Sequence, residues 1–176
     1  MSPTGWSVMA VLKLCSVGMA ARLTPFGSGS LAVRPYDPAA DHVHVSALAG
    51  DLPTAGPPPI VRPQGLLGEL RGRPGRDVSA WLAWQAATAP DSERAVGLIT
   101  LVAARGPTGE RRWSVGWLVV RPAARRGGVG RQLVAVALSA AAAAGAAVVW
   151  AETDTAWPGS LAFWRAVGFE PVRRAT

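Results

Sequence analysis

The sequence is poor in the residues that build disulfides and metal centres. Among its 176 residues Cys15 is the only cysteine, which excludes an intramolecular disulfide and a zinc site made of several cysteines. His42 and His44 are the only histidines, so a histidine-rich metal site is excluded as well. No apolar run reaches the ~20 residues of a membrane-spanning helix, because glycine, proline or arginine interrupts each one. We therefore expect no bound metal and no membrane span.

Lysine and acidic residues are also scarce, whereas arginine is abundant. Lys13 is the only lysine among 18 basic residues, which face 11 acidic ones and leave a net charge of +7. A charge of this size can indicate a nucleic-acid partner. However, the arginines are not interleaved with aromatic residues as on a nucleic-acid platform. Arginine also accompanies alanine, glycine and proline, whose codons are all GC-rich. We therefore do not expect nucleic acid as the partner.

Residues 1–28 differ from the rest in containing no acidic residue. They do not fit a secretory signal, because Lys13 interrupts the apolar run instead of preceding it. We interpret them as a loosely held tail or extension of a domain at residues 29–176, and we expect a cytoplasmic protein. A second interpretation is an extra helix or strand packed on the domain, and a targeting segment is the third.

The remaining sequence predicts a single α/β domain with a sheet of mixed direction. The helix at residues 38–49 is expected to be capped by Asp37 and to turn Val43, Ala47 and Leu48 toward the core. The strands at 95–104 and 112–120 are separated by a short turn and predict an antiparallel hairpin. Further strands are expected at 30–36, 78–87, 146–151 and from 169, and further helices at 64–71, 132–144 (ended by Gly145) and 160–167.

A glycine-rich loop between the fourth strand and the following helix is the most informative motif. Glycines allow the backbone to approach a phosphate closely, and the first N–H groups of a helix stabilise an anion. The loop lacks the lysine of a Walker motif, and it lacks the third glycine of a dinucleotide fingerprint. Three arginines lie within it or directly beside it, which suits a pyrophosphate. The loop reads Arg125-Arg126-Gly127-Gly128-Val129-Gly130-Arg131.

The sequence around this loop resembles the GCN5-related N-acetyltransferase (GNAT) superfamily. The family signature R/Q-x-x-G-x-G/A falls on Arg125, Gly128 and Gly130, preceded by Val120 and Pro122, and the ending LAFWRAVGFEPV also looks like that of the family. The resemblance covers about residues 30–173. It implies a mixed, mostly antiparallel sheet of about six or seven strands with helices on both faces.

The resemblance also implies a donor site and a reaction. Acetyl-CoA would be the cosubstrate, and an amine would attack its thioester directly, without a covalent enzyme intermediate. The strands at 112–120 and 146–151 would separate to admit the pantetheine arm. Cofactor contacts would come from the fourth strand, the glycine-rich loop and the last helix, at Leu118, Val119, Val120, Arg125, Arg126, Gly127, Gly128, Val129, Gly130, Arg131 and Trp164.

The catalytic residues depart from the family pattern. The place where the family often has a tyrosine as general acid is occupied by Trp164, whose indole N–H does not titrate at useful pH. Glu152 and Asp154, which follow the strand at 146–151, are the candidates for the base, and a loop ion pair explains them equally well. A non-catalytic acyl-CoA-binding or regulatory domain is therefore the alternative to an acetyltransferase. The sequence leaves the acceptor amine and a homodimer open.

Overall fold

A computed structural model describes residues 9–15, 31–52, 63–86, 93–106, 108–154, 157 and 159–172. Its centre is a 7-stranded sheet in the order β2-β3-β4-β5-β6-β1-β7. All neighbouring pairs are antiparallel except β5 and β6, which are parallel. The strands are β1 (Met9–Cys15), β2 (Leu31–Pro35), β3 (Arg76–Ala86), β4 (Glu93–Arg105), β5 (Arg111–Val120), β6 (Val148–Asp154) and β7 (Glu170–Pro171).

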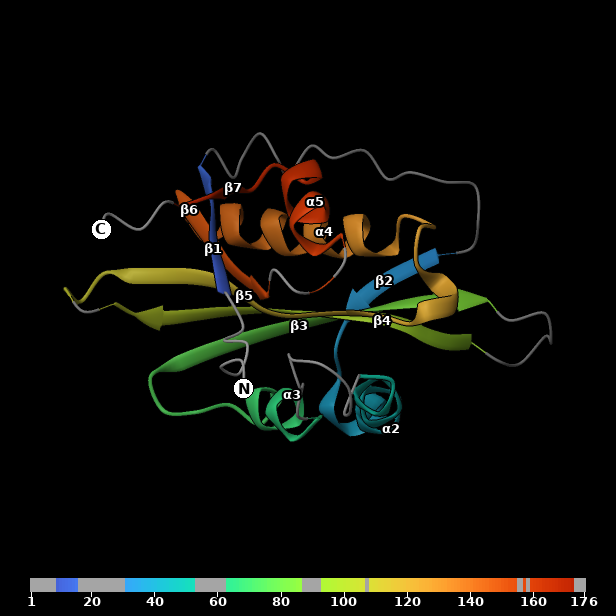
Figure 1. The fold of residues 1–176 in the computed structure, drawn as a ribbon. Helices are drawn as coiled ribbons and strands as arrows, with labels where there is room; N and C mark the ends of the chain where they lie inside the picture. Colours follow the sequence, from blue (N-terminus) through green and yellow to red (C-terminus); the bar gives the residue numbers. More distant parts are fainter. Residues whose placement is uncertain are drawn as a thin grey trace, which may run out of the picture.

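Helices cover both faces of this sheet, as Figure 1 shows. On one face lie α2 (Pro38–Gly50) and α3 (Pro63–Leu70), and on the other lie α4 (Val129–Ala143) and α5 (Ser160–Ala166). Each face has its own buried apolar cluster, one beneath α4 and α5 and one beneath α2 and α3. This three-layer arrangement confirms the fold that the sequence predicts. None of the described helices is long and apolar enough to cross a membrane.

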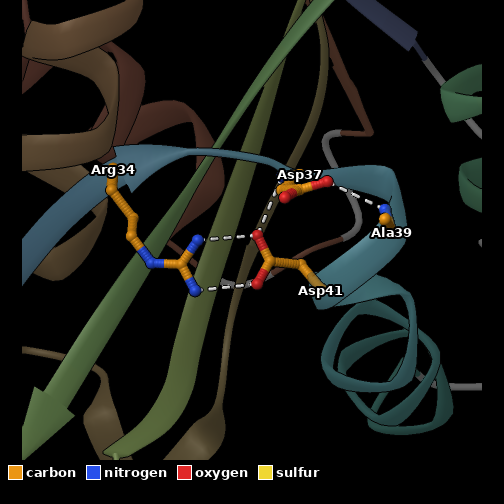
Figure 2. Close-up of polar contacts among 4 residues, drawn as sticks. All are labelled: Arg34, Asp37, Ala39 and Asp41. Atoms are coloured by element: carbon orange, nitrogen blue, oxygen red, sulfur yellow. Dashed lines mark hydrogen bonds and ion pairs between the residues drawn. The ribbon is translucent and has the colours of Figure 1, made fainter.

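The first helix begins where the sequence predicts, but it turns a different face to the core. Asp37 caps α2 by accepting a hydrogen bond from the Ala39 N–H at 2.9 Å, as Figure 2 shows. Val43, expected in the core, is 66% exposed, and Ala47 is exposed as well. The buried residues follow the spacing i, i+4, i+7 and i+8, and they are Asp41, Val45, Leu48 and Ala49.

Asp41 is buried on this face because Arg34 of β2 reaches over it (Figure 2). The guanidinium donates to both carboxylate oxygens, at 2.7 and 2.8 Å, and the Asp37 N–H donates to Oδ2 at 2.9 Å. The same guanidinium lies 4.4 Å from the ring centroid of Trp84. A buried carboxylate that is paired in this way fixes the rotation of α2 about its axis. The pairing therefore explains why Val43 faces solvent.

Seven residues of the expected tail are part of the sheet. Residues Met9–Cys15 form β1, which pairs with β6 along its whole length and with β7 at two positions. Leu12 and Leu14 of this strand are buried in the core beneath α4 and α5. The tail interpretation is therefore wrong for these residues, and the alternative of an extra strand packed on the domain describes them. The rest of residues 1–28 lies outside the described part of the chain.

The partner strand β1 also lengthens β6. The sequence predicts a strand at 146–151, whereas β6 starts at Val148 and continues to Asp154. The register pairs Asp154 with Met9 and Glu152 with Val11, so the extra residues are held by β1. Antiparallel pairing gives these positions backbone partners that the sequence of β6 alone does not reveal.

Candidate functional site

The sheet opens between β5 and β6. Three consecutive positions pair the two strands, from Trp113–Val149 to Val115–Ala151, and no later position of β5 has a described partner on β6. Beyond Ala151, β6 is paired with β1 on its other side. The backbone of β5 after Val115 therefore borders a gap between two neighbouring strands. The predicted cofactor contacts Leu118, Val119 and Val120 lie on this stretch of β5.

A bulge lies at the point where the strands separate. The register pairs Leu101 with Val115 and Ile99 with Leu118, so Gly116 and Trp117 of β5 face the single residue Thr100 of β4. A bulge of this kind bends the strand and re-aims its side chains. Thr100 is fully buried, and its hydroxyl accepts a hydrogen bond from the Trp117 N–H at 2.8 Å. The bulge in β5 therefore lies where β5 separates from β6.

The glycine-rich loop leads from the end of β5 to the amino end of α4. A short 3-10 turn, Pro122–Ala124, comes first, and Arg125 donates from Nε to the Val120 carbonyl at 3.1 Å. Arg126 and Gly128 have φ of 66° and 83°, which glycine adopts readily and arginine rarely does. Gly128 is the N-cap of α4, and no side chain caps this helix end. Its backbone N–H groups can therefore serve an anion.

The remaining loop residues form the first turn of α4 or lie just before it. Val129 is buried in the core, Gly130 and Arg131 are partly buried, and Gly127 is exposed. A Cβ on Gly130 would lie 3.3 Å from the ring of Phe163, so this glycine allows α5 to pass close to the amino end of α4. The sequence assigns Gly130 to phosphate binding, and the structure adds a packing reason for it.

The structure places Phe163, rather than Trp164, beside the glycine-rich loop. Trp164 is 6% exposed and packs edge-on against Phe163 and Phe169, with ring centroids 5.4 and 5.0 Å apart. Core packing alone accounts for this tryptophan, and its contact with a cofactor stays a prediction. Phe163 belongs to the ending that resembles the family, but of these two residues only Trp164 was expected from the sequence to contact the cofactor.

The two predicted base candidates differ in their surroundings. Both lie within β6 and not in a loop after it, because β1 extends the strand. Glu152 is exposed, whereas Asp154 is 3% exposed. The backbone carbonyl of Asp154 accepts hydrogen bonds from the Ser160 hydroxyl at 3.0 Å and from the Trp157 N–H at 3.2 Å, which ties β6 to the start of α5. Their catalytic roles stay a prediction.

The only tyrosine lies far from the opening of the sheet. Tyr36 directly follows β2, and β3, β4 and β5 separate that strand from β6. Burial raises the pKa of its hydroxyl, and the nearby carboxylates of Asp41 and Asp37 raise it further. Tyr36 therefore does not replace the missing tyrosine of the last helix. Among the described residues, no three His, Cys, Asp or Glu side chains are grouped as a metal site would require.

Comparison with known proteins agrees with this geometry. The family model of the Acetyltransferase (GNAT) family matches residues 62–169, which is more than half of the chain. The chain belongs to the GNAT acetyltransferase family. The family's general activity is acetyl-CoA-dependent N-acetylation. No curated protein is significantly similar to it in sequence.

Several solved structures share the fold of this GNAT chain. An acetyltransferase from Trypanosoma brucei is 20% identical, with 84% of this chain and 97% of that chain covered and a TM-score of 0.57. AAC(6')-Iy, solved with a bisubstrate analogue containing CoA, is 18% identical, with 83% and 95% covered and a TM-score of 0.62. A GCN5-related N-acetyltransferase from Sphaerobacter thermophilus is 16% identical, with 93% and 48% covered and a TM-score of 0.60. At these identities the likeness concerns the fold.

Proposed function

We propose that this protein transfers the acetyl group of acetyl-CoA directly to the nitrogen of an amine. The observation that carries the proposal is the opening between β5 and β6, which leads from the bulge at Gly116 and Trp117 to the uncapped amino end of α4. Such an opening offers backbone groups to an extended arm along one strand and N–H groups to a pyrophosphate at its end. AAC(6')-Iy, which has the same fold, was solved with a CoA-containing bisubstrate analogue.

The reaction requires few protein groups. The nitrogen lone pair attacks the thioester carbonyl carbon, the C–N bond forms, the C–S bond breaks and sulfur leaves as a thiolate. The first N–H groups of α4, with Arg126 and Arg131, would hold the pyrophosphate, and the main chain of Leu118 and Val120 would hold the pantetheine arm. A thiolate is a modest base (the pKa of a thiol is ~8.5), so it can leave without an enzymic acid.

The second candidate function is a regulatory domain that binds acyl-CoA without transferring the acyl group. The tryptophan at position 164 favours it, because its indole does not titrate at the place where the family often has a tyrosine. Both candidates require the same donor site and differ only in turnover. We expect a cytoplasmic protein in either case, and cell fractionation measures this.

The donor site can be tested with two matched glycine variants. Gly128 and Gly145 lie at opposite ends of α4, with φ of 83° and 81° and no heavy atom within 4 Å of a Cβ at either position. We expect Gly128→Glu to abolish binding of acetyl-CoA in calorimetric titration, because it places a negative charge where the pyrophosphate would lie. Gly145→Glu introduces the same backbone strain and charge, and it should bind acetyl-CoA like the unmodified protein.

Unchanged affinity in the Gly128→Glu protein would refute the assignment of the donor site. If acetyl-CoA binds one to one, a screen of amines with detection of free thiol separates the two candidate functions. Turnover identifies an enzyme, whereas tight binding without turnover identifies a regulator. Absence of binding by acetyl-CoA and by longer acyl-CoA would exclude both.

A further inference from the structure

Glu69 of α3 places a carboxylate directly over the bulge of β5. It lies in the last turn of α3, and its side chain is 13% exposed. A Cβ built on Gly116 would overlap the Glu69 carboxylate and would lie 2.7 Å from Thr100 Oγ1. Similarly, a Cβ on Gly65 would lie 3.1 Å from the ring of Trp117. The two glycines therefore allow α3 to approach β5 closely enough for Glu69 to reach the point where the sheet opens.

Hydrogen bonds hold this carboxylate in place. The Thr100 hydroxyl donates to Glu69 Oε1 at 2.6 Å, and the same hydroxyl accepts from the Trp117 N–H at 2.8 Å. The hydroxyl is thus oriented by the backbone of the bulge, and it orients the carboxylate in turn. The other oxygen, Oε2, lies 3.6 Å from a guanidinium nitrogen of Arg76. The two carboxylate oxygens therefore have different partners, Thr100 for Oε1 and Arg76 for Oε2.

A small hollow opens beside Glu69, between α3 and the start of β3. Its volume is about 60 Å³, and its lining residues are Gly65, Glu69, Arg73, Arg76 and Val78. A single water requires ~10–15 Å³ of such space, so the hollow accepts about four to six non-hydrogen atoms. An amino group, one carbon and a carboxylate together have this size. The hollow thus suits the polar end of a small molecule.

The charges around the hollow favour a ligand with both signs. One carboxylate and two guanidinium groups line it, which leaves one net positive charge. A tight turn brings the arginines together, since the Arg76 N–H donates to the Arg73 carbonyl at 3.0 Å and Gly75 has a φ of 76°. A carboxylate binds an ammonium group, and guanidinium groups bind carboxylate or phosphate. A simple cationic amine would leave the excess positive charge without a partner.

We propose that Glu69 is the catalytic base and that the acceptor is an amine that carries an anionic group, a carboxylate or a phosphate. This proposal rests on the proposed acetyl transfer and concerns its acceptor side. Glu69 receives the proton that the nitrogen loses as the C–N bond forms and the C–S bond breaks. The carboxylic acid then releases that proton to solvent, and the departing thiolate takes a proton from solvent. Arg73 and Arg76 hold the anionic group of the acceptor.

This assignment differs from the one that the sequence suggests. Glu152 lies on β6, is exposed and is paired through its backbone with Val11. Glu69, by contrast, is mostly buried, is fixed by Thr100 and lies against the bulge. Glu69 lies 47 positions before Gly116 in the sequence, so the sequence alone does not reveal the contact between them.

Three glutamate variants test the base. Glu69→Gln keeps an oxygen for the Thr100 hydroxyl, and we expect it to lower kcat/KM by at least ~100-fold at neutral pH, the usual contribution of a general base. Its affinity for acetyl-CoA should stay within about twofold, because the proposed contacts to acetyl-CoA come from the end of β5, the glycine-rich loop and α4, and not from Glu69. Raising the pH should restore part of the activity, since the free amine then loses its proton in solution. Glu170→Gln, an exposed change on β7, is the control and should keep full activity.

The third variant, Glu152→Gln, separates the two assignments. We expect the turnover of Glu152→Gln to stay within about threefold of that of the unmodified protein. Loss of turnover in Glu152→Gln together with full turnover in Glu69→Gln would overturn the proposal. A drop in Glu69→Gln that high pH does not relieve would likewise overturn the base role in favour of a structural one. Failure of acetyl-CoA to bind the unmodified protein would instead refute the proposed function.

The acceptor class is tested with matched probe pairs on the CoA-loaded protein. The twenty amino acids are compared with their amides, and glucosamine 6-phosphate is compared with glucosamine, by calorimetric titration and by turnover with acetyl-CoA. We expect the anionic member of at least one pair to bind at least ~10-fold more tightly than its neutral partner, and the pair shows whether the anion is a carboxylate or a phosphate. Arg73→Gln should remove this preference, whereas Arg71→Gln, which does not line the hollow, should keep it. Equal binding of both members, or no binding of any probe, would overturn the acceptor class.

Discussion

Strand β1 offers the sharpest test of the fold, because the sequence favours a loosely held tail here whereas the structure places these residues inside the sheet. Leu12 is fully buried and lies in the core beneath α4 and α5, between the neighbouring strands β6 and β7. Truncating a buried leucine to alanine costs about 2–5 kcal/mol of unfolding free energy. We expect Leu12→Ala to cost about 3 kcal/mol, since a strand with partners on both sides leaves little room for the cavity to collapse.

The assay is urea unfolding followed by tryptophan fluorescence, with a thermal melt as a second measurement. For a chain of this size, 3 kcal/mol corresponds to a midpoint about 6–12 °C lower. The control is Cys15→Ala, because Cys15 lies in the same strand but is exposed, and its truncation should cost no more than about 0.5 kcal/mol. If Leu12→Ala and Cys15→Ala unfold at the same urea concentration as the unmodified protein, residues 9–15 are not part of the sheet.

Two further predictions concern stability. Burial raises the pKa of the Asp41 carboxyl, but hydrogen bonds from Arg34 and the Asp37 N–H outweigh it, so this pKa lies below its usual value. The pair therefore stabilises the fold above the unfolded-state pKa of ~3.9 and stops doing so as the pH falls through the folded-state pKa. Asp41→Asn should lower the unfolding free energy by about 2 kcal/mol at pH 7 and by less at pH 3. Urea unfolding at both pH values measures this, and a larger loss at pH 3 than at pH 7 would contradict it. Gly97→Ala should destabilise by about 1–3 kcal/mol in the same assay, because the added Cβ would lie 3.0 Å from the Val119 carbonyl oxygen. Gly68→Ala is the control, because the space around its Cβ is open and alanine favours the helix by up to about 1 kcal/mol. Equal urea midpoints for the two variants would refute the close contact at Gly97.

The elements that local patterns specify were predictable from the sequence. Asp37 followed by a proline marks the start of α2, and the glycine-rich loop marks the start of α4 to within three residues. The hairpin of β4 and β5 follows from two apolar runs and a short turn. In each case the signal lies within about ten residues of the element, because caps and turns act on neighbouring backbone groups.

Features that depend on side-chain or strand partners in another element were not predictable. The rotation of α2 is set by Arg34, which precedes the helix, and by a buried ion pair that hydrophobic patterning treats as exposed. The length of β6 is set by β1, whose sequence lies more than a hundred positions earlier. Neither partner can be found from periodicity, since periodicity reports only the faces of one element.

The proposed donor and acceptor sides of the site differ in the same way. The donor side consists of the end of β5, the loop and the start of α4, which are consecutive in sequence, so a motif could reveal it. The acceptor side combines α3, the turn before β3 and the bulge between β4 and β5, and only the fold brings these together. Close approach of α3 to β5 requires glycine at two separate positions, Gly65 and Gly116, and neither belongs to a recognisable motif. In the proposed assignment the contiguous part binds the donor and the assembled part binds the acceptor, so members of this fold can exchange acceptors while keeping acetyl-CoA. In the same proposal, the positive charge of the residues next to Glu69 is the property that distinguishes this chain's acceptor.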